Sequence, residues 1–313
     1  MATKGVKSRI GSVKNIQKIT RAMEMVAAAR LRRAEQRISN LRPYAGAIRR
    51  MTRQAAEAAG NISGVPVLTQ HESENTIAIM LVTGDRGLAG AFNSQIIRAG
   101  IRAGNEYEAE GKTVVYYASG RRGVSSLTFR KKELAGQYTG FTDRPAYANA
   151  REIGNDLTAA FVDGEVDRVE IFYNGFVSAL TQEVTRETLL PLQEASIFED
   201  ARAAGEETVG EAGGERSETG EKQDTGHHAL VEYEPDPDVI LQRLVPEYVQ
   251  ISIFRALLES TASEHGARMT AMRNASENAG DLIKDLTLQM NRERQAEITQ
   301  EIMEVVAGAE SLV

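Results

Sequence analysis

The last quarter of the chain, Asp236 to Ser311, has the pattern of one helix, which at roughly 1.5 Å per residue would be about 100 Å long. Steps of four and three residues alternate in it, as is typical of a coiled-coil stripe. The stripe consists of Leu258, Thr261, His265, Arg268, Met272, Ala275, Ala279, Leu282, Leu286 and Gln289. Because a globular domain made from the other residues would be only about 30 to 40 Å across, most of this helix must project.

The N-terminal stretch, Lys4 to Tyr44, supplies the expected partner helix. The same spacing recurs there in Val13, Ile16, Thr20, Met23, Ala27, Arg30, Ala34, Arg37 and Leu41. Several seam positions in both stretches are alanines rather than leucines, so the two helices must approach closely. We therefore expect residues 1–58 and 235–313 to form a long antiparallel coiled coil that carries one domain at a single end.

Charge supports this pairing of the two ends. Residues 1–53 hold 14 Lys and Arg but 2 Asp and Glu, whereas residues 234–313 hold 7 Lys and Arg and 14 Asp and Glu. A basic segment on a chain of net charge −7 needs an acidic partner, which is either its own C-terminal helix, another subunit or nucleic acid.

The middle of the chain predicts an α/β domain over residues 75–192. Expected strands are Thr76 to Thr83, Thr113 to Ala118, Val166 to Val177 and Ala179 to Leu189, with helices from near Asn93 and over Pro145 to Val162, and a short helix or loop over Gly120 to Leu127. Strands that alternate with helices favour a Rossmann-like layer domain with a mixed sheet. Residues 193–234 form an acidic insert and connection, since Glu199 to Asp224 contains nine acidic and three basic residues.

Several classes of function lack positive signals. Without cysteine there is no disulfide, thiol catalysis or cysteine-type zinc site. No apolar run approaches the roughly 18 residues of a membrane span, and no secretory signal is expected, so membrane association is predicted only through partners. The pair His227 and His228 has no second cluster at metal-ligand spacing. No cofactor, metal or catalytic residue is predicted.

Two alternatives stay open from the residues alone. The turn Gly84 to Gly90 follows a strand and opens a helix, where phosphates bind in dinucleotide folds, but its spacing is G-x-x-G-x-x-G. A nucleotide-binding enzyme with a coiled-coil arm would bind or hydrolyse nucleotide alone. The basic cluster Arg30, Arg32, Arg33 and Arg37 fits a nucleic-acid scaffold, although the apolar stretch Met23 to Ala29 favours a protein partner.

The pattern as a whole favours a non-catalytic, mechanical or scaffolding protein. It has a two-helix shaft, a globular foot and an apolar helix end, Ile298 to Val306, with no evident place to bury within the chain. We call this end the apolar tip. An exposed apolar surface of this kind implies a sleeve supplied by other chains.

The termini also resemble a known family. Residues 19–27 (ITRAMEMVA) and 298–309 (ITQEIMEVVAGA) are similar to the two terminal signatures of the gamma subunit of F-type ATP synthase. Further motifs of that family are matched by Thr83 to Gly90, Tyr233 to Pro237 and Ser263 to Asn278, so the resemblance covers nearly the whole chain.

The resemblance implies a rotor shaft without catalytic residues of its own. In the family the paired helices thread the hexamer of alpha and beta subunits, while the foot lies on the c-subunit ring beside epsilon, peripheral to the cell membrane on its cytoplasmic side. Nucleic acid is not a partner. Contacts with the alpha/beta hexamer would involve Arg21, Met23, Glu24, Gln295, Thr299 and Glu301. Contacts with the c ring and epsilon would involve Tyr233 and Glu234.

The acidic stretch Glu199 to Asp224 lies where photosynthetic relatives carry a regulatory insertion. The chloroplast form uses a cysteine pair there, and this chain has no cysteine. We therefore expect a passive or sterically regulatory surface segment without redox switching.

Overall fold

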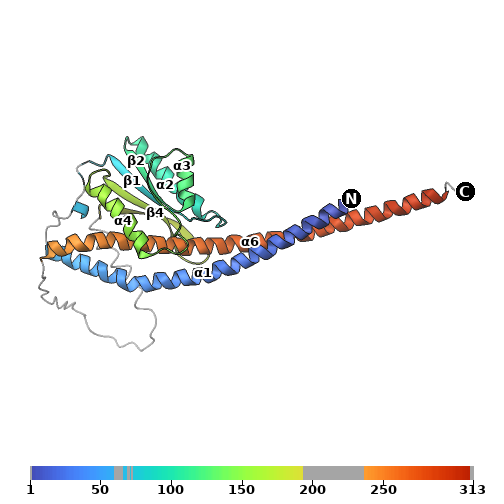
Figure 1. The fold of residues 1–313 in the computed structure, drawn as a ribbon, viewed down its shortest axis with the longest axis horizontal. Helices are drawn as coiled ribbons and strands as arrows, with labels where there is room; N and C mark the ends of the chain where they lie inside the picture. Colours follow the sequence, from blue (N-terminus) through green and yellow to red (C-terminus); the bar gives the residue numbers. More distant parts are fainter. Residues whose placement is uncertain (1, 60–65, 69–70, 72, 193–235, 311–313) are drawn as a thin grey trace, which may run out of the picture.

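Two long antiparallel helices and one α/β domain make up the part of the chain that the structure describes. The computed structural model describes residues 2–59, 66–68, 71, 73–192 and 236–310. Helix α1 spans Ala2–Ala59 and helix α6 spans Pro237–Glu310. The α/β domain lies beside one end of the pair, and at the other end α6 extends well past the start of α1 (Figure 1). The predicted fold class is therefore confirmed.

Three contact clusters set the register of α1 against α6. Near the free end, Val6 and Ile10 pack with Leu286. In the middle, Leu31 and Ala34 pack with Ala262, and near the domain end Ile48 packs with Leu244 and Ile251. The alanines in the middle cluster allow the close approach that the sequence predicts. Pro43 and Pro246 lie inside the two helices, and the sequence pattern had given no weight to Pro246.

The predicted stripe on α6 is buried from Leu258 to Met272, and its members Ala279 and Leu286 are buried too, but the rest of the contact line moves beyond Met272. Leu282 is 47% exposed and Gln289 is exposed, whereas Ile283 packs against α1. On α1, Ile16 is 52% exposed and its neighbour Gln17 donates to the Ser276 carbonyl at 3.2 Å. The stripe prediction was wrong at Leu282, Gln289 and Ile16. A stripe with a period of 3.5 drifts around a helix that has 3.6 residues per turn, so a fixed alternation of steps leaves the contact line.

The α/β domain holds a five-stranded sheet. Its elements in chain order are β1 Thr76–Val82, α2 Phe92–Ala109, β2 Thr113–Ser119, α3 Arg121–Phe129, β3 Leu134–Tyr138, α4 Tyr147–Val162, β4 Arg168–Phe176 and β5 Gln182–Leu190, preceded by the short 3₁₀ helix η1 Pro66–Leu68. The strand order is β3-β2-β1-β4-β5, with β5 antiparallel to β4 and the other pairs parallel. Strand β3 was not predicted, because its sequence LAGQY has little β propensity.

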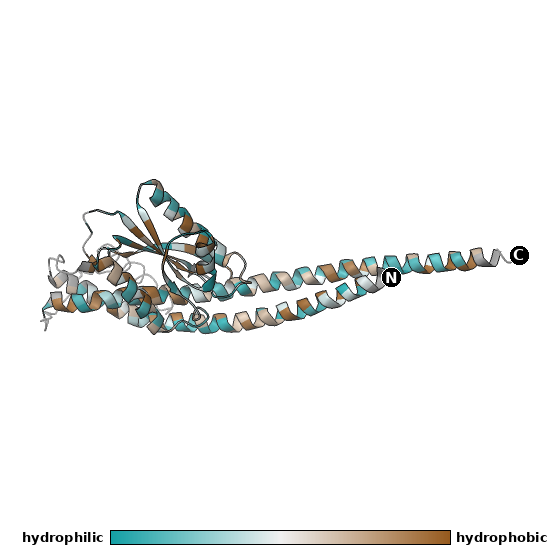
Figure 2. Ribbon diagram, turned by 45° about the horizontal axis from the view of Figure 1, so that its top comes forward, coloured by the Kyte–Doolittle hydropathy of each residue, from teal (hydrophilic) through white to brown (hydrophobic). Residues whose placement is uncertain are grey.

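Helix α6 is itself a layer of this domain. Ile79 and its neighbours on one face of the sheet pack against α2 and α3. Met80, on the other face, belongs to a core with Leu157 of α4 and with Ile253 and Leu257 of α6. Because both faces are covered, β1 is apolar along its length instead of alternating. Figure 2 shows the apolar residues gathered in the sheet, whereas polar and apolar residues are mixed along the shaft.

Candidate partner-binding surfaces

The crevice where open α/β sheets bind ligands is filled by α6 in this chain. Ligands in such folds lie outside the carboxyl ends of the parallel strands. Here the Glu264 carboxyl lies against Gly84, so that a Cβ added at Gly84 would be 2.7 Å from its Cδ. Arg268 donates to the Gly87 carbonyl at 3.3 Å, and Ser260 donates to the Val82 carbonyl at 3.4 Å. The turn that resembled a phosphate loop is therefore packed against protein.

The polar residues of α6 at this crevice form a buried cluster. Arg268 forms an ion pair with Glu264, and its other nitrogen lies 3.3 Å from His265 Nδ1. Burial raises the pKa of Glu264, although Arg268 opposes the rise. Burial and the neighbouring Arg268 lower the pKa of His265 to about 4, so this ring is neutral at pH 7. The cluster fixes the position of α6 against the domain.

No grouping of His, Cys, Asp and Glu suited to a metal ion occurs among the described residues. Within the same described ranges, no helix has the length and hydropathy of a membrane span. The pair His227 and His228 lies outside the described residues, as do Tyr233, Glu234 and the acidic stretch Glu199 to Asp224.

The structure places the six predicted contact residues on the shaft at two separate levels. Glu24 accepts from Arg273 Nε at 2.9 Å, so Arg21, Met23 and Glu24 lie beside that part of α6. Gln295, Thr299 and Glu301 are exposed further along α6. Since Arg273 and Gln295 are separated by about 33 Å of helix, the two groups do not meet. They would contact different parts of any surrounding partner.

The level around Glu24 and Arg273 is nearer the α/β domain, and we call it the lower level. It has a polar groove and an apolar surface. A hollow of about 680 Å³ is lined by Gln17, Arg21, Glu24, Arg273, Ser276, Glu277, Gly280, Asp281 and Lys284. At the same level on α1, Ile16, Ile19 and Val26 are each more than half exposed. From the sequence, Met23 is predicted as a contact residue and Ile16 is placed on the seam, but no contact is assigned to Ile19 or Val26, although these two lie four and three residues from Met23.

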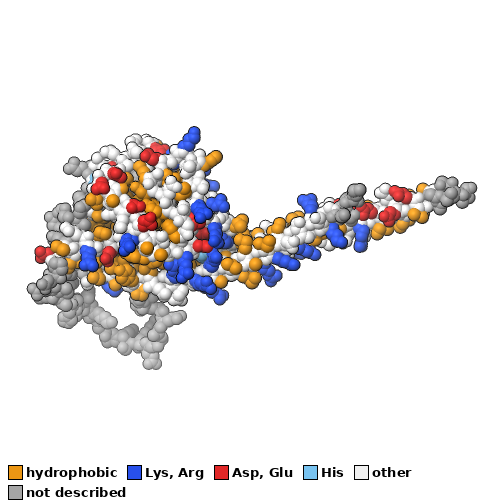
Figure 3. Space-filling model, in the orientation of Figure 1, with side chains coloured by type: hydrophobic (Ala, Val, Ile, Leu, Met, Phe, Trp, Pro, Cys, Tyr) orange, Lys and Arg blue, Asp and Glu red, His pale blue; other side chains and the backbone are white. Residues whose placement is uncertain are grey.

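The upper level is the apolar tip. Ile298, Ile302, Met303, Val305 and Val306 are exposed by 46 to 72%. Val6 of α1 packs beside Leu286, and α1 begins at Ala2, so the tip has no α1 helix beside it (Figure 1). Figure 3 shows hydrophobic side chains on the surface along the shaft. The predicted exposure of this apolar helix end is confirmed.

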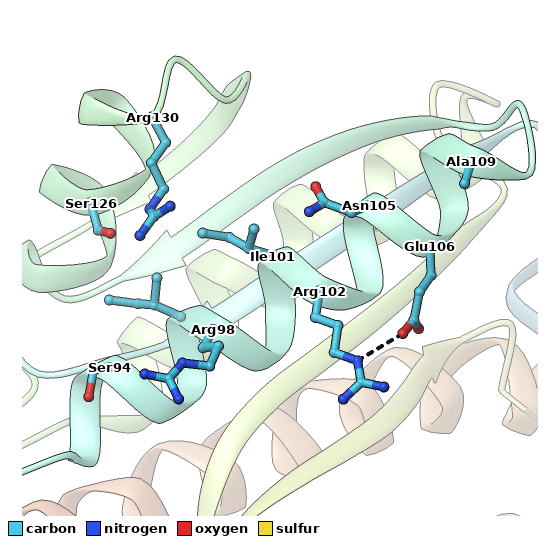
Figure 4. Close-up of a pocket in the computed structure, with 10 residues that line it drawn as sticks. Ser94, Arg98, Ile101, Arg102, Asn105, Glu106, Ala109, Ser126 and Arg130 are labelled. Carbon is cyan, nitrogen blue, oxygen red and sulfur yellow. Dashed lines mark hydrogen bonds and ion pairs between the residues drawn. The ribbon is translucent and has the colours of Figure 1, made fainter.

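A further groove that sequence reasoning did not foresee lies between α2 and α3. It has a volume of about 600 Å³, and Ile97 and Ile101 lie among its lining residues. Figure 4 shows Arg98 and Arg102 of α2 on one side and Arg130, which directly follows α3, across from them, with Arg102 donating to Glu106 at 3.0 Å. Since Glu106 pairs with Arg102, Arg98 and Arg130 supply the excess positive charge of the groove, which favours an acidic partner surface.

Comparison with known proteins decides the family. A family model described as ATP synthase matches residues 2–312. The ATP synthase gamma chain of Rubrobacter xylanophilus is 43% identical over 307 residues, which are 98% of this chain and 97% of that relative. The chain belongs to the ATP synthase gamma chain family. The resemblance that the terminal motifs carry is thereby confirmed.

Chains in solved structures of mitochondrial ATP synthases share the fold. A chain from the Euglena gracilis mitochondrial ATP synthase, in a structure of OSCP, F1 and the c-ring, matches with a TM-score of 0.66 at 16% identity, covering 99% of this chain and 94% of that one. A chain from the central stalk and c-ring of the Tetrahymena thermophila mitochondrial enzyme matches with a TM-score of 0.58 at 24% identity, covering 82% and 99%. At these identities the similarity supports the fold alone.

Proposed function

We propose that this chain is the central rotor shaft of an F-type ATP synthase. It would couple ion-driven rotation of the c ring to ATP synthesis and hydrolysis on the beta subunits, regulate the ATPase, and carry no catalytic residue itself. The observation that carries the proposal is the apolar tip, which projects beyond the end of α1 with its large side chains about half exposed or more. An apolar helix end of this kind needs a sleeve from other subunits.

The shaft has different chemistry around its circumference, which is what a rotor needs. At the lower level the α1 side exposes Ile16, Ile19 and Val26, while the groove at that level exposes Glu277 and Asp281. Subunits arranged around such a shaft would each contact a different face. A ligand can shift a conformational equilibrium only by binding two states unequally, and the same holds for a shaft. Turning the shaft would therefore drive each beta subunit through different affinities for nucleotide.

We assign the contact residues to partners by level. Arg21, Met23 and Glu24 would face the lower parts of the alpha and beta subunits. Gln295, Thr299 and Glu301 share the projecting end of α6 with the apolar tip and would lie inside the sleeve.

The foot would carry the remaining partners. Tyr233 and Glu234 stay assigned to the c ring and epsilon through the family motif. The chain would be peripheral to the cell membrane on its cytoplasmic side and held there by these partners alone.

The direct test is the ATPase activity of purified alpha and beta subunits with and without this chain, and of the chain by itself. A shaft is expected to be inert alone, to assemble with alpha and beta, and to raise their turnover. Hydrolysis by the isolated chain, or failure to join the complex, would contradict the proposal and favour a nucleotide-binding enzyme.

A charge placed at the lower level sharpens this test. Met23→Lys should reduce the turnover or the coupling of the assembled complex, because it places an ammonium group at the surface that turns against the beta subunits. Val162→Lys is the matched control, since Val162 is 48% exposed at the end of α4, in the α/β domain. Equal activity of the two variants would remove Met23 from the contact surface.

A further inference from the structure

We propose that residues 139–146, the connection from β3 to α4, lock both shaft helices to the α/β domain. We call this connection the neck loop. It would carry torque from the foot into α1 as well as α6, and the inference rests on the proposed function as a rotor. Three sets of contacts carry it, one on each body that the loop joins.

The neck loop is fastened to the α/β domain through Asp85 in the turn after β1. One carboxylate oxygen of Asp85 accepts from the Gly140 amide at 2.9 Å, the Thr142 amide at 3.2 Å and the Thr142 hydroxyl at 3.1 Å. Its other oxygen accepts from the Arg121 amide at 3.1 Å. Burial opposes ionisation of Asp85, but these hydrogen bonds outweigh it and hold its pKa below the ordinary value. Asp85 in the turn is thus a charged acceptor shared by the neck loop and the first residue of α3.

The neck loop is fastened to α6 through its backbone. The Thr261 hydroxyl of α6 shares its one proton between the Thr142 carbonyl at 2.9 Å and the Leu257 carbonyl of α6 at 2.7 Å. One turn further along α6, burial and Arg268 lower the pKa of His265, and this ring lies close enough to Asp143 for that residue to oppose the lowering. Both α6 side chains are buried. A buried hydrogen bond is costly to leave unmade, so the loop and α6 move together.

The neck loop is fastened to α1 by two arginines. Arg30 Nη1 lies 2.5 Å from Asp143 Oδ2, and Arg37 donates to the Pro145 carbonyl. Arg86, in the turn after β1, also reaches Asp143 Oδ2 at 3.4 Å. Burial would raise the pKa of Asp143, but Arg30 and Arg86 outweigh it and lower that pKa. One carboxylate therefore joins α1 to the domain.

The contacts of the neck loop oppose slippage between α1 and α6, which the packing between the two helices opposes only weakly. In the middle of the shaft α1 meets α6 through apolar packing, Leu31 and Ala34 against Ala262, which has no directional bonds to oppose sliding and twisting. Packed helices shear past each other readily in many conformational changes. Charged hydrogen bonds from one loop to α1, α6 and the domain have defined directions, so they oppose such slippage. The loop also explains why Arg30 and Arg37, two of the four clustered arginines, point into the molecule.

The test uses the complete synthase in vesicles with the variant Asp143→Asn, which removes the charge but keeps the shape. Gradient-driven ATP synthesis and ATP-driven ion pumping should both fall about threefold or more, within the range seen when a coupling network is altered. ATP hydrolysis by the complex without the c ring should stay unchanged, because no torque then enters through the foot. Asp143→Glu should restore coupling, since it retains the carboxylate.

Glu108→Gln is the matched control. Glu108 pairs with Lys132 at 2.7 Å within the α/β domain, away from the shaft, so losing this charge should leave coupling unchanged. A second variant, Asp85→Ala, releases the loop from the domain side and should reproduce the defect. The torsional stiffness of the shaft is an independent measurement. A bead attached at Thr128→Cys reports it, and the attachment is specific within this chain because the chain has no other cysteine. Stiffness should be lower in Asp143→Asn and Asp85→Ala.

Assembled Asp143→Asn and Asp85→Ala complexes with wild-type coupling and stiffness would overturn the lock. A defect of equal size in Glu108→Gln would overturn it as well, since charge loss anywhere in the foot would then suffice. If the unaltered chain fails to stimulate alpha and beta subunits, the proposed function itself is contradicted. The two failures are therefore distinguishable.

Discussion

The two ends of α6 both carry large apolar side chains but have opposite surroundings. In the foot, Ile253 and Leu257 are at most 2% exposed, because the sheet and α4 cover them. At the apolar tip, Ile302 and Val305 are 57 and 72% exposed. Apolar periodicity thus predicts the helix at both ends. In the foot the chain itself covers the apolar side chains, whereas at the tip other subunits must cover them.

The foot end of α6 therefore acts on the stability of the fold, and the apolar tip acts on assembly with other subunits. Burying apolar surface stabilises a fold by about 25 cal/mol per Å², so the foot end of α6 contributes to the stability of the isolated chain. The tip contributes nothing of this kind until a partner covers it. Substitutions at the two ends should therefore have effects of different size and in different assays.

The largest effect is expected in the foot. Leu257→Ala should lower the free energy of unfolding of the chain by about 3 kcal/mol, through lost burial and the cavity left against the sheet. Denaturant titration followed by circular dichroism measures it. Leu288→Ala, at a position 58% exposed on the shaft, is the control and should change stability by less than about 0.5 kcal/mol. Equal losses would show that the two ends do not differ.

A pH effect of intermediate size is expected at His265. The pKa of His265 in the folded chain is about 4, below the ordinary 6.5. Its contribution to the free energy of unfolding is therefore complete above pH 6.5 and is lost as the pH falls toward 4. At pH 5 the chain should be about 2 kcal/mol less stable on this account than at pH 7. His265→Gln should lack that part of the loss in denaturant titrations at the two pH values. An unchanged pH slope in this variant would place His265 in a solvated site.

The smallest effect on stability is expected at the tip. Ile302→Ser with Val305→Ser should change the free energy of unfolding by less than about 0.5 kcal/mol, because both side chains already face water. In the assembled complex the same double variant should weaken retention of the chain and lower ATPase stimulation. Full stimulation would contradict the proposed sleeve.

Periodicity predicted most of the fold because long helices repeat their signal many times. It failed where a signal is short or local, as in the five-residue strand β3 and at Leu282, where helix drift moves the contact line. The exposed tip was foreseeable because no complementary apolar stretch is left in the chain. The ion pair of Arg30 with Asp143 was not foreseeable from the sequence, because residues so distant in the chain have no periodic relation.

The central claim is that this chain turns as a shaft inside a ring of other subunits. The most direct measurement immobilises an alpha and beta complex on a surface and follows a probe on the foot, at Thr128→Cys, while ATP is supplied. We predict continuous rotation of the probe in one direction that stops when ATP is removed. A probe that stays fixed, or fluctuates without direction in a complex that hydrolyses ATP, would contradict the claim.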